Sequence, residues 1–240
     1  MSRQMRRRSG LIAAAAVGLL AVALSSEGWA LAYQHANQAG RPENWQPVSQ
    51  MHLYLCAFHV AKENPGFQVQ AHHYCSPQGK DLHQCVIYDS RGSSAKLLGI
   101  EYIIPDSVYQ TLPADEKKYW HPHAYEIIAG QLVAPDMPDM GDEAFKGLIT
   151  TWGKTWHTWR DPSTALPMGA PLLMWSANGD GQVAQKLIDG RDTDFGISTA
   201  QIRQRRSAYG YAVPNIPPPK SINDVGRRWT ATGPDEPVKR

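Results

Sequence analysis

Histidines gather in short clusters along the middle of the chain. The 240 residues contain nine histidines, and they include HHYC at 72–75, HQC at 83–85, HPH at 121–123 and a lone His157. Neutral imidazole is a preferred ligand of zinc, copper and iron. Because proline disfavours a helix at the residue before it, 120–123 is expected to be extended. Residues two apart in an extended segment share a face, so His121 and His123 could chelate one ion together.

A carboxylate lies close to this pair, at a spacing that resembles one known metal motif. In cupin barrels three or four residues separate His-x-His from the following Glu, whereas only two residues separate His123 from Glu126. This spacing puts Glu126 on the opposite face of a regular strand unless a bulge intervenes.

We therefore hypothesise a divalent transition metal site (zinc, iron or copper) formed from five histidines: His72, His73, His121, His123 and His157. His72 and His73 point to opposite faces of a strand, so only one of them can join the others, and the apolar alternation places His73 on the core side. The alternative is a set of histidines that are hydrogen-bonded parts of a polar core or cleft. His157, between two tryptophans, could simply pack.

Other catalytic signatures are missing from the sequence. It has no Gly-x-Ser-x-Gly elbow, P-loop, His-Glu-x-x-His or dinucleotide glycine motif. Asn178-Gly179-Asp180-Gly181 lacks the recurring acidic ligands of a calcium loop and predicts a turn. A cysteine nucleophile, Cys75 or Cys85 beside a histidine, stays open as an alternative.

The N-terminus has the pattern of an export signal. Four arginines, the last of them Arg8, precede an uncharged run at 11–24, which is shorter than the roughly 20 residues of a spanning helix. Small residues then favour cleavage after Ala30 or Ala32, so we expect a signal peptide at 1–32 and a periplasmic or secreted protein. An uncleaved single anchor is the alternative.

The charge balance argues against nucleic-acid binding. Removing 1–32 takes away four of the 24 basic residues and one of the 22 acidic residues, leaving 20 against 21. A nearly neutral body has no basic stripe to attract phosphate. We therefore expect no nucleic-acid partner.

Three cysteines allow at most one internal disulfide. Cys75 and Cys85 could face each other across a hairpin, provided that their Cα atoms come within about 7 Å. Buried thiols at Cys56, Cys75 and Cys85 are the alternative.

The periodicities predict a single α+β domain at 48–209, with a mainly antiparallel sheet flanked by short helices. We expect strands at 67–73, 84–89, 96–104 and 125–133, and helices at 48–61, 142–151, 182–187 and 198–209. Pro105 and Pro113 should each open a short helix. A polar leader at 33–47 precedes the domain, and a Pro-rich extended tail at 210–240 follows it.

Several long motifs in order resemble the oil-body-associated protein family. They are HHYC at 72–75, QCVIYD at 84–89, LGIEYI at 98–103 and EKKYWHPHAYE at 116–126, and the likeness continues through GKT at 153–155, LPMGAP at 166–171 and FGIS at 195–198. It spans about 51–209. Plant members are associated with the surface of seed lipid droplets, and fungal and bacterial relatives form a domain family without an established reaction. Since these proteins occupy reducing compartments, the resemblance implies that Cys75 and Cys85 need not be bridged.

Two functions follow as hypotheses. The first is an exported binding or structural protein of the cell envelope that touches a lipid or membrane surface. The second is a metal-dependent enzyme that uses His121, His123 and one of the remaining candidate histidines.

Overall fold

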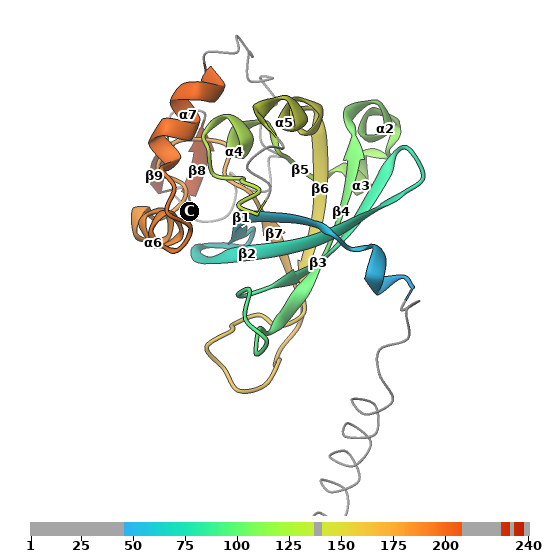
Figure 1. Ribbon diagram of the computed structural model, residues 1–240, viewed down its shortest axis with the longest axis horizontal. Helices are drawn as coiled ribbons and strands as arrows, with labels where there is room; N and C mark the ends of the chain where they lie inside the picture. The colour runs from blue at the N-terminus through green and yellow to red at the C-terminus, as the bar shows by residue number, and fades with distance from the viewer. Residues whose placement is uncertain (1–45, 137–140, 208–226, 231–232, 238–240) are drawn as a thin grey trace, which may run out of the picture. The chain divides into compact units, whose positions relative to one another are not determined.

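A closed barrel of six antiparallel strands forms the centre of the fold (Figure 1). The computed structural model describes residues 46–136, 141–207, 227–230 and 233–237. The barrel strands are β1 (Leu53–Ala61), β2 (Asn64–Gln78), β3 (Leu82–Tyr88), β4 (Leu97–Pro105), β6 (Thr151–His157) and β7 (Leu172–Trp175). They pair in the order β4-β3-β2-β1-β7-β6, and β6 pairs back onto β4. The short strand β5 (His121–Pro122) also pairs with β6. The predicted α+β class is confirmed.

A glycine allows the barrel to close. Gly99 on β4 is paired with His157 on β6, and a Cβ added at Gly99 would lie 1.9 Å from the backbone oxygen of Trp156. No side chain fits there, so only glycine lets β4 and β6 approach closely enough to pair.

Short helices cover parts of the barrel. They are α2 (Asp106–Thr111), α3 (Ala114–Lys117), α4 (Ala124–Ile128), α5 (Gly141–Ile149), α6 (Gln185–Phe195) and α7 (Thr199–Ser207). A 3₁₀ helix, η1 (Val48–Gln50), precedes β1 in the chain. Pro105 and Pro113 directly precede α2 and α3, as predicted. The helix expected at 182–187 begins later and runs to Phe195, where Gly196 ends it in the left-handed region with φ 63°.

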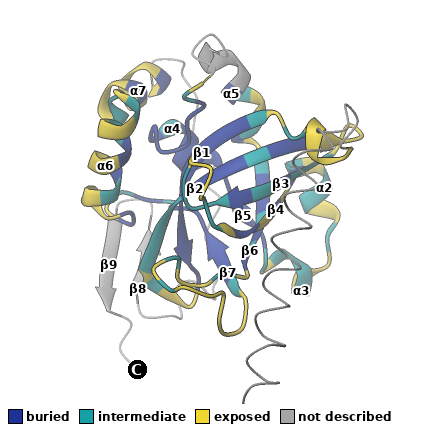
Figure 2. Ribbon diagram, turned by 60° about the horizontal axis from the view of Figure 1, so that its bottom comes forward, coloured by how far each residue is buried: buried dark blue, intermediate teal, exposed yellow. Residues whose placement is uncertain are grey.

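The helix expected at 48–61 is wrong. Most of that segment is strand β1, whose residues from Tyr54 to Ala61 are all buried (Figure 2). One side of β1 contacts the barrel interior, while Phe58 and Val60 pack with Val183 and Ile188 of the α6 region. A strand covered on both faces has no polar alternation, so its continuous apolar run looks the same as a buried helix.

The strand expected at 125–133 is also wrong. Ala124–Ile128 forms helix α4, and Gly130 then turns the chain with φ 74°. Both faces of α4 are covered, since Tyr125 packs with Phe58 and Ile127 packs with Leu55. The alternation of residue types at 125–133 therefore did not report a strand. Of this segment, Val133 alone pairs with a strand, through a bridge to Cys56.

Cys75 and Cys85 form a disulfide across β2 and β3, with Cα atoms 4.1 Å apart. The register places the two residues directly opposite each other. Cys56 is free and buried. The hairpin geometry thus decides a question that the sequence left open.

The ends of the chain lie mostly outside the described residues. The predicted signal peptide at 1–32 is outside them, as is the polar leader up to residue 45. Within the predicted tail, β8 (Arg227–Thr230) and β9 (Gly233–Pro237) pair as antiparallel strands. In the parts of the chain that the structure describes, no helix has the length and apolar character needed to cross a membrane.

Candidate metal centre

Seven histidine and carboxylate side chains meet inside the barrel. They come from β1, β2, β4, β5, β6 and the start of α4, and none is more than 3% exposed: His59, His73, Glu101, His121, His123, Glu126 and His157. Along β4, Glu101 and Ile103 face inward while Ile100 and Tyr102 are exposed. Strand alternation therefore carries a carboxylate into the core.

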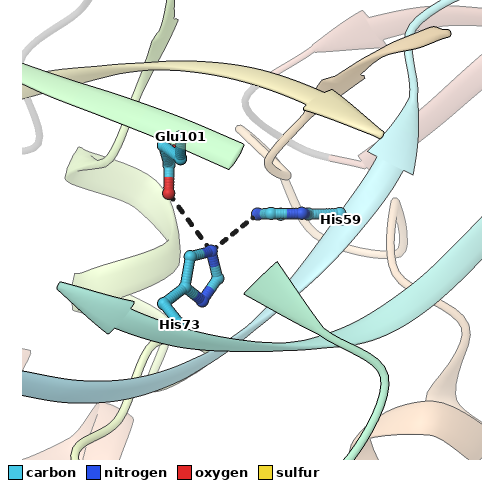
Figure 3. Close-up of side chains that lie close together, drawn as sticks. All are labelled: His59, His73 and Glu101. Atoms are coloured by element: carbon cyan, nitrogen blue, oxygen red, sulfur yellow. Dashed lines mark hydrogen bonds and ion pairs between the residues drawn. The ribbon is translucent and has the colours of Figure 1, made fainter. Parts of the chain in front are cut away.

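Glu101 lies at the centre of the group, and its two oxygens have different neighbours. Oε1 lies 3.3 Å from His121 Nε2 and 3.4 Å from His123 Nε2. Oε2 lies 3.1 Å from His73 Nε2, which is itself 3.0 Å from His59 Nε2 (Figure 3). The Thr155 hydroxyl donates to Oε1 at 2.8 Å.

Gly153 leaves room for these atoms. A Cβ at this position on β6 would lie 2.1 Å from Glu101 Oε1, 2.5 Å from His123 Nε2 and 2.8 Å from His121 Nε2. Gly153 pairs with His121 across β5 and β6. A missing side chain therefore opens the space into which three ligand atoms converge.

A hydrogen-bond chain fixes the proton of His123. The Thr151 hydroxyl donates to the Leu148 carbonyl at 2.7 Å, so its oxygen accepts from His123 Nδ1 at 2.8 Å. A neutral His123 then presents the lone pair of Nε2 to Glu101 Oε1. Two acceptors face each other at 3.4 Å, an arrangement that a cation between them would stabilise.

A small cavity adjoins the group. Its volume is about 10 Å³, which is close to the room that one water molecule needs. Its polar lining consists of His59, His73, Glu101, His123 and Glu126, and its apolar lining includes Leu55, Ile103 and Leu132. Glu126 Oε1 lies 4.0 Å from His123 Nε2.

Burial sets the protonation of the metal-free site. Burial alone would raise the pKa of Glu101, but the close imidazoles of His121, His123 and His73 hold it well below its usual value. Burial lowers the pKa of His59 and His121, and it lowers that of His157 to about 3. Burial and the nearby Glu101 carboxylate raise the pKa of Glu126 well above its usual value. The rings of His59, His121 and His157 are therefore neutral near pH 7, and His59 and His121 each keep one nitrogen lone pair for a cation.

The structure brings together four of the five predicted histidines. As expected, only one of the adjacent pair points inward, and it is His73. His72 lies on the other face of β2, where its Nδ1 is 2.7 Å from the Tyr54 hydroxyl. His72 lines a separate polar pocket with Gln70 and Arg91. His157 is inside the barrel but touches the group through His59, Nε2 to Nδ1 at 2.9 Å.

Sequence reasoning missed His59, Glu101 and the inward position of Glu126. His59 fell in the segment expected to be a helix, which concealed its alternation with Ala57. Glu101 was the one detectable signal, because it is a lone charge within the apolar strand LLGIEYII at 97–104. Glu126 points inward because its segment is helical, so no bulge is required.

Comparison with known proteins places these residues in a family. Residues 45–209 match the family described as "Protein of unknown function (DUF1264)". Oil body-associated protein 1A of Zea mays is 39% identical over 170 residues, which cover 70% of this chain and 71% of that protein. Oil body-associated protein 2C of Arabidopsis thaliana is 36% identical over 191 residues, 78% of each chain.

No solved structure matches the chain. The match at 45–209 covers the whole barrel, the candidate metal centre and helices α2 to α7. With relatives above 30% identity over more than two thirds of their length, the resemblance read from the motifs is confirmed, and the chain belongs to the oil body-associated protein family.

Proposed function

We propose that this protein binds a divalent transition metal ion inside its barrel, through Glu101, His121 and His123. The convergence of three donor atoms carries the proposal. An ion about 2.1 Å from each ligand holds neighbouring ligand atoms about 3.0 Å apart in octahedral geometry and about 3.4 Å apart in tetrahedral geometry. The contacts of 3.3 and 3.4 Å to Glu101 Oε1 fit the tetrahedral edge. They are longer than ordinary charged hydrogen bonds, which are about 2.7–2.9 Å.

The donor set narrows the choice of ion. Two imidazoles and one carboxylate suit zinc, iron or copper, whereas magnesium and calcium prefer oxygen ligands. The Thr151 hydroxyl oxygen accepts a hydrogen bond from the Nδ1–H group of His123, as the outer partners of metal-bound histidines do.

The water-sized cavity favours a metal-dependent enzyme over a purely structural metal site. Structural zinc sites are closed by four protein ligands, whereas catalytic sites keep three and leave a position for water. The cavity lies against His123, and the Glu126 carboxyl lines it as well. Glu126 is therefore placed to exchange a proton with a water bound at the open position.

Elemental analysis tests metal binding directly. Protein purified without a histidine tag and reconstituted with zinc, iron or copper should retain at least one equivalent per chain after desalting. The double variant His121→Gln/His123→Gln should retain one equivalent fewer than the wild type. His72→Gln is a matched control, because His72 is also buried but lies on the outer face of β2. Wild-type protein that retains no ion from any of the three salts would overturn the proposal.

We also propose export and contact with a lipid surface. Supporting observations are the arginine-led apolar run at 11–24, the names of the oil body-associated relatives, and the exposed Leu166 and Met168, at 65% and 64%, between β6 and β7. Exposed apolar side chains of this kind partition into the boundary between headgroups and acyl chains.

Two measurements test this second proposal. Mass spectrometry of protein from the culture medium or periplasm should find a chain that begins after Ala30 or Ala32, and an intact N-terminus inside the cell would contradict export. Liposome flotation should retain the wild type and lose Leu166→Ser/Met168→Ser. Leu97→Ser, on an exposed strand position, is the control. Equal flotation of all three proteins, or none of the wild type, would contradict lipid contact through this loop.

A further inference from the structure

We infer that the barrel holds two metal ions, bridged by the Glu101 carboxylate. This inference rests on the proposed metal-binding function and extends it. One ion would occupy the position between Glu101 Oε1, His121 and His123. The second would lie between Oε2, His59 and His73 (Figure 3).

The second position has its own ligand geometry. His73 Nε2 lies 3.0 Å from His59 Nε2 and 3.1 Å from Glu101 Oε2. Both distances fit the edge of about 3.0 Å between neighbouring ligands of an octahedral ion. The two groups of ligands share Glu101 and no other residue.

Hydrogen bonds alone do not satisfy this arrangement. An imidazole nitrogen offers one site, either a proton or a lone pair. His73 Nε2 can therefore make one full hydrogen bond, either with His59 or with Glu101, although both partners lie at hydrogen-bond distance. A cation between the two imidazole nitrogens and Glu101 Oε2 would interact with the lone pairs of all three atoms at once. A single shared proton would not.

His157 supports the second position from behind. Its Nε2 lies 2.9 Å from His59 Nδ1. If the Nδ1–H group of His59 donates a hydrogen bond to His157 Nε2, the lone pair on His59 Nε2 faces His73 and Glu101. This is the tautomer that a metal ligand needs, so we assign His157 as a positioning residue instead of a ligand.

The cavity connects the two positions. Its lining includes His59 and His73 from one set and His123 from the other, with Glu101 and Glu126. A water-sized ligand there would lie against both ions. Two-metal centres hold their ions about 3.5–4 Å apart and share a bridging ligand of this kind. Two divalent ions also exceed the charge of the two carboxylates, which favours hydroxide as that ligand.

Cobalt titration tests the inference with the ion itself as the probe. Co²⁺ added to metal-free protein is followed by visible absorption and by electron paramagnetic resonance. Wild-type protein should take up two equivalents, and the spins of the two ions should couple. His59→Gln/His73→Gln and His121→Gln/His123→Gln should each take up one uncoupled equivalent, while His72→Gln should behave as wild type.

The outcomes separate the two proposals. One equivalent in the wild type would overturn the bridged pair and leave the single site standing, and no uptake would overturn both. Two equivalents without spin coupling would also overturn the bridged pair, because ions joined by one carboxylate interact. If a double variant fails to fold, the wild-type stoichiometry and coupling still decide. A His157→Gln variant should weaken the second equivalent by about 10–100-fold and leave the first unchanged.

Discussion

Glu101 is the residue on which the interior of the barrel depends. A lone buried carboxylate costs several kcal/mol unless it is paired. Here three imidazoles and the Thr155 hydroxyl surround it. The neighbouring Gly153 leaves the space in which these groups meet.

Gly153→Ala should therefore weaken metal binding strongly while the barrel still forms. The new methyl group would overlap Glu101 Oε1 and the Nε2 atoms of His123 and His121. We expect metal affinity to fall by more than about 100-fold, beyond the loss of an outer partner, and stability to fall by about 1–3 kcal/mol from overpacking. Gly190→Ala, in open space on α6, is the control. Isothermal titration with zinc measures the affinity, and equal affinity in the two variants would contradict the role of Gly153.

Glu126 gives a pH-dependent prediction for the metal-free protein. Burial, with the nearby Glu101 carboxylate, raises its pKa well above 4.5. Between pH 4.5 and the raised pKa the folded state keeps this proton and the unfolded chain releases it, so the group's contribution to stability falls as pH rises. Glu126→Gln removes this effect.

The stability difference between Glu126→Gln and the wild type should grow with pH, by up to about 1.4 kcal/mol per unit. Urea denaturation in the presence of a chelator between pH 5 and 8 measures it. A difference that is constant with pH would show that Glu126 is ionised in the folded, metal-free protein.

At the scale of the elements, the sequence predicted those strands whose residues alternate between a buried and a more exposed face, and it missed the elements that are buried on both faces. One face of β3 is partly buried and one face of β4 is exposed, so both strands alternate, and the prolines before α2 and α3 mark helix starts. β1 and α4 are covered on both sides, so the spacing of their apolar residues does not distinguish a strand from a helix. His121, His123 and the inward direction of His73 followed from local spacing. His59 and Glu101 required the barrel closure, which joins strands far apart in the chain.

Arg191 holds α6 against the loop that follows α4. It is fully buried, and its guanidinium donates to the carbonyls of Gln131 and Gly130 and to Asp192. Arg191→Leu would remove the donor to the two buried carbonyls, so we expect a loss of about 3 kcal/mol in unfolding free energy. Arg203→Leu breaks a half-exposed ion pair with Asp180 and should cost at most about 1 kcal/mol. Chemical denaturation measures the unfolding free energy of both variants. Equal losses would contradict the role of Arg191 in holding α6 in place.

For the whole molecule, metal binding should appear as stability. An ion that binds only the folded state adds about 2.7 kcal/mol at a hundred times its dissociation constant. For a chain of this size each kcal/mol raises Tm by about 2–4 °C. Calorimetry with zinc and with a chelator should therefore differ by about 5–10 °C. The Leu166→Ser/Met168→Ser variant should show the same difference, because that loop is exposed and contributes no ligand. Identical Tm values with and without zinc would show that the folded barrel gains nothing from the ion.

Anomalous X-ray diffraction from crystals grown with zinc tests the central claim most directly. We predict a strong peak inside the barrel, about 2.0–2.2 Å from Glu101 Oε1 and from the Nε2 atoms of His121 and His123. Zinc peaks confined to surface residues, with these three side chains joined only by hydrogen bonds, would contradict it.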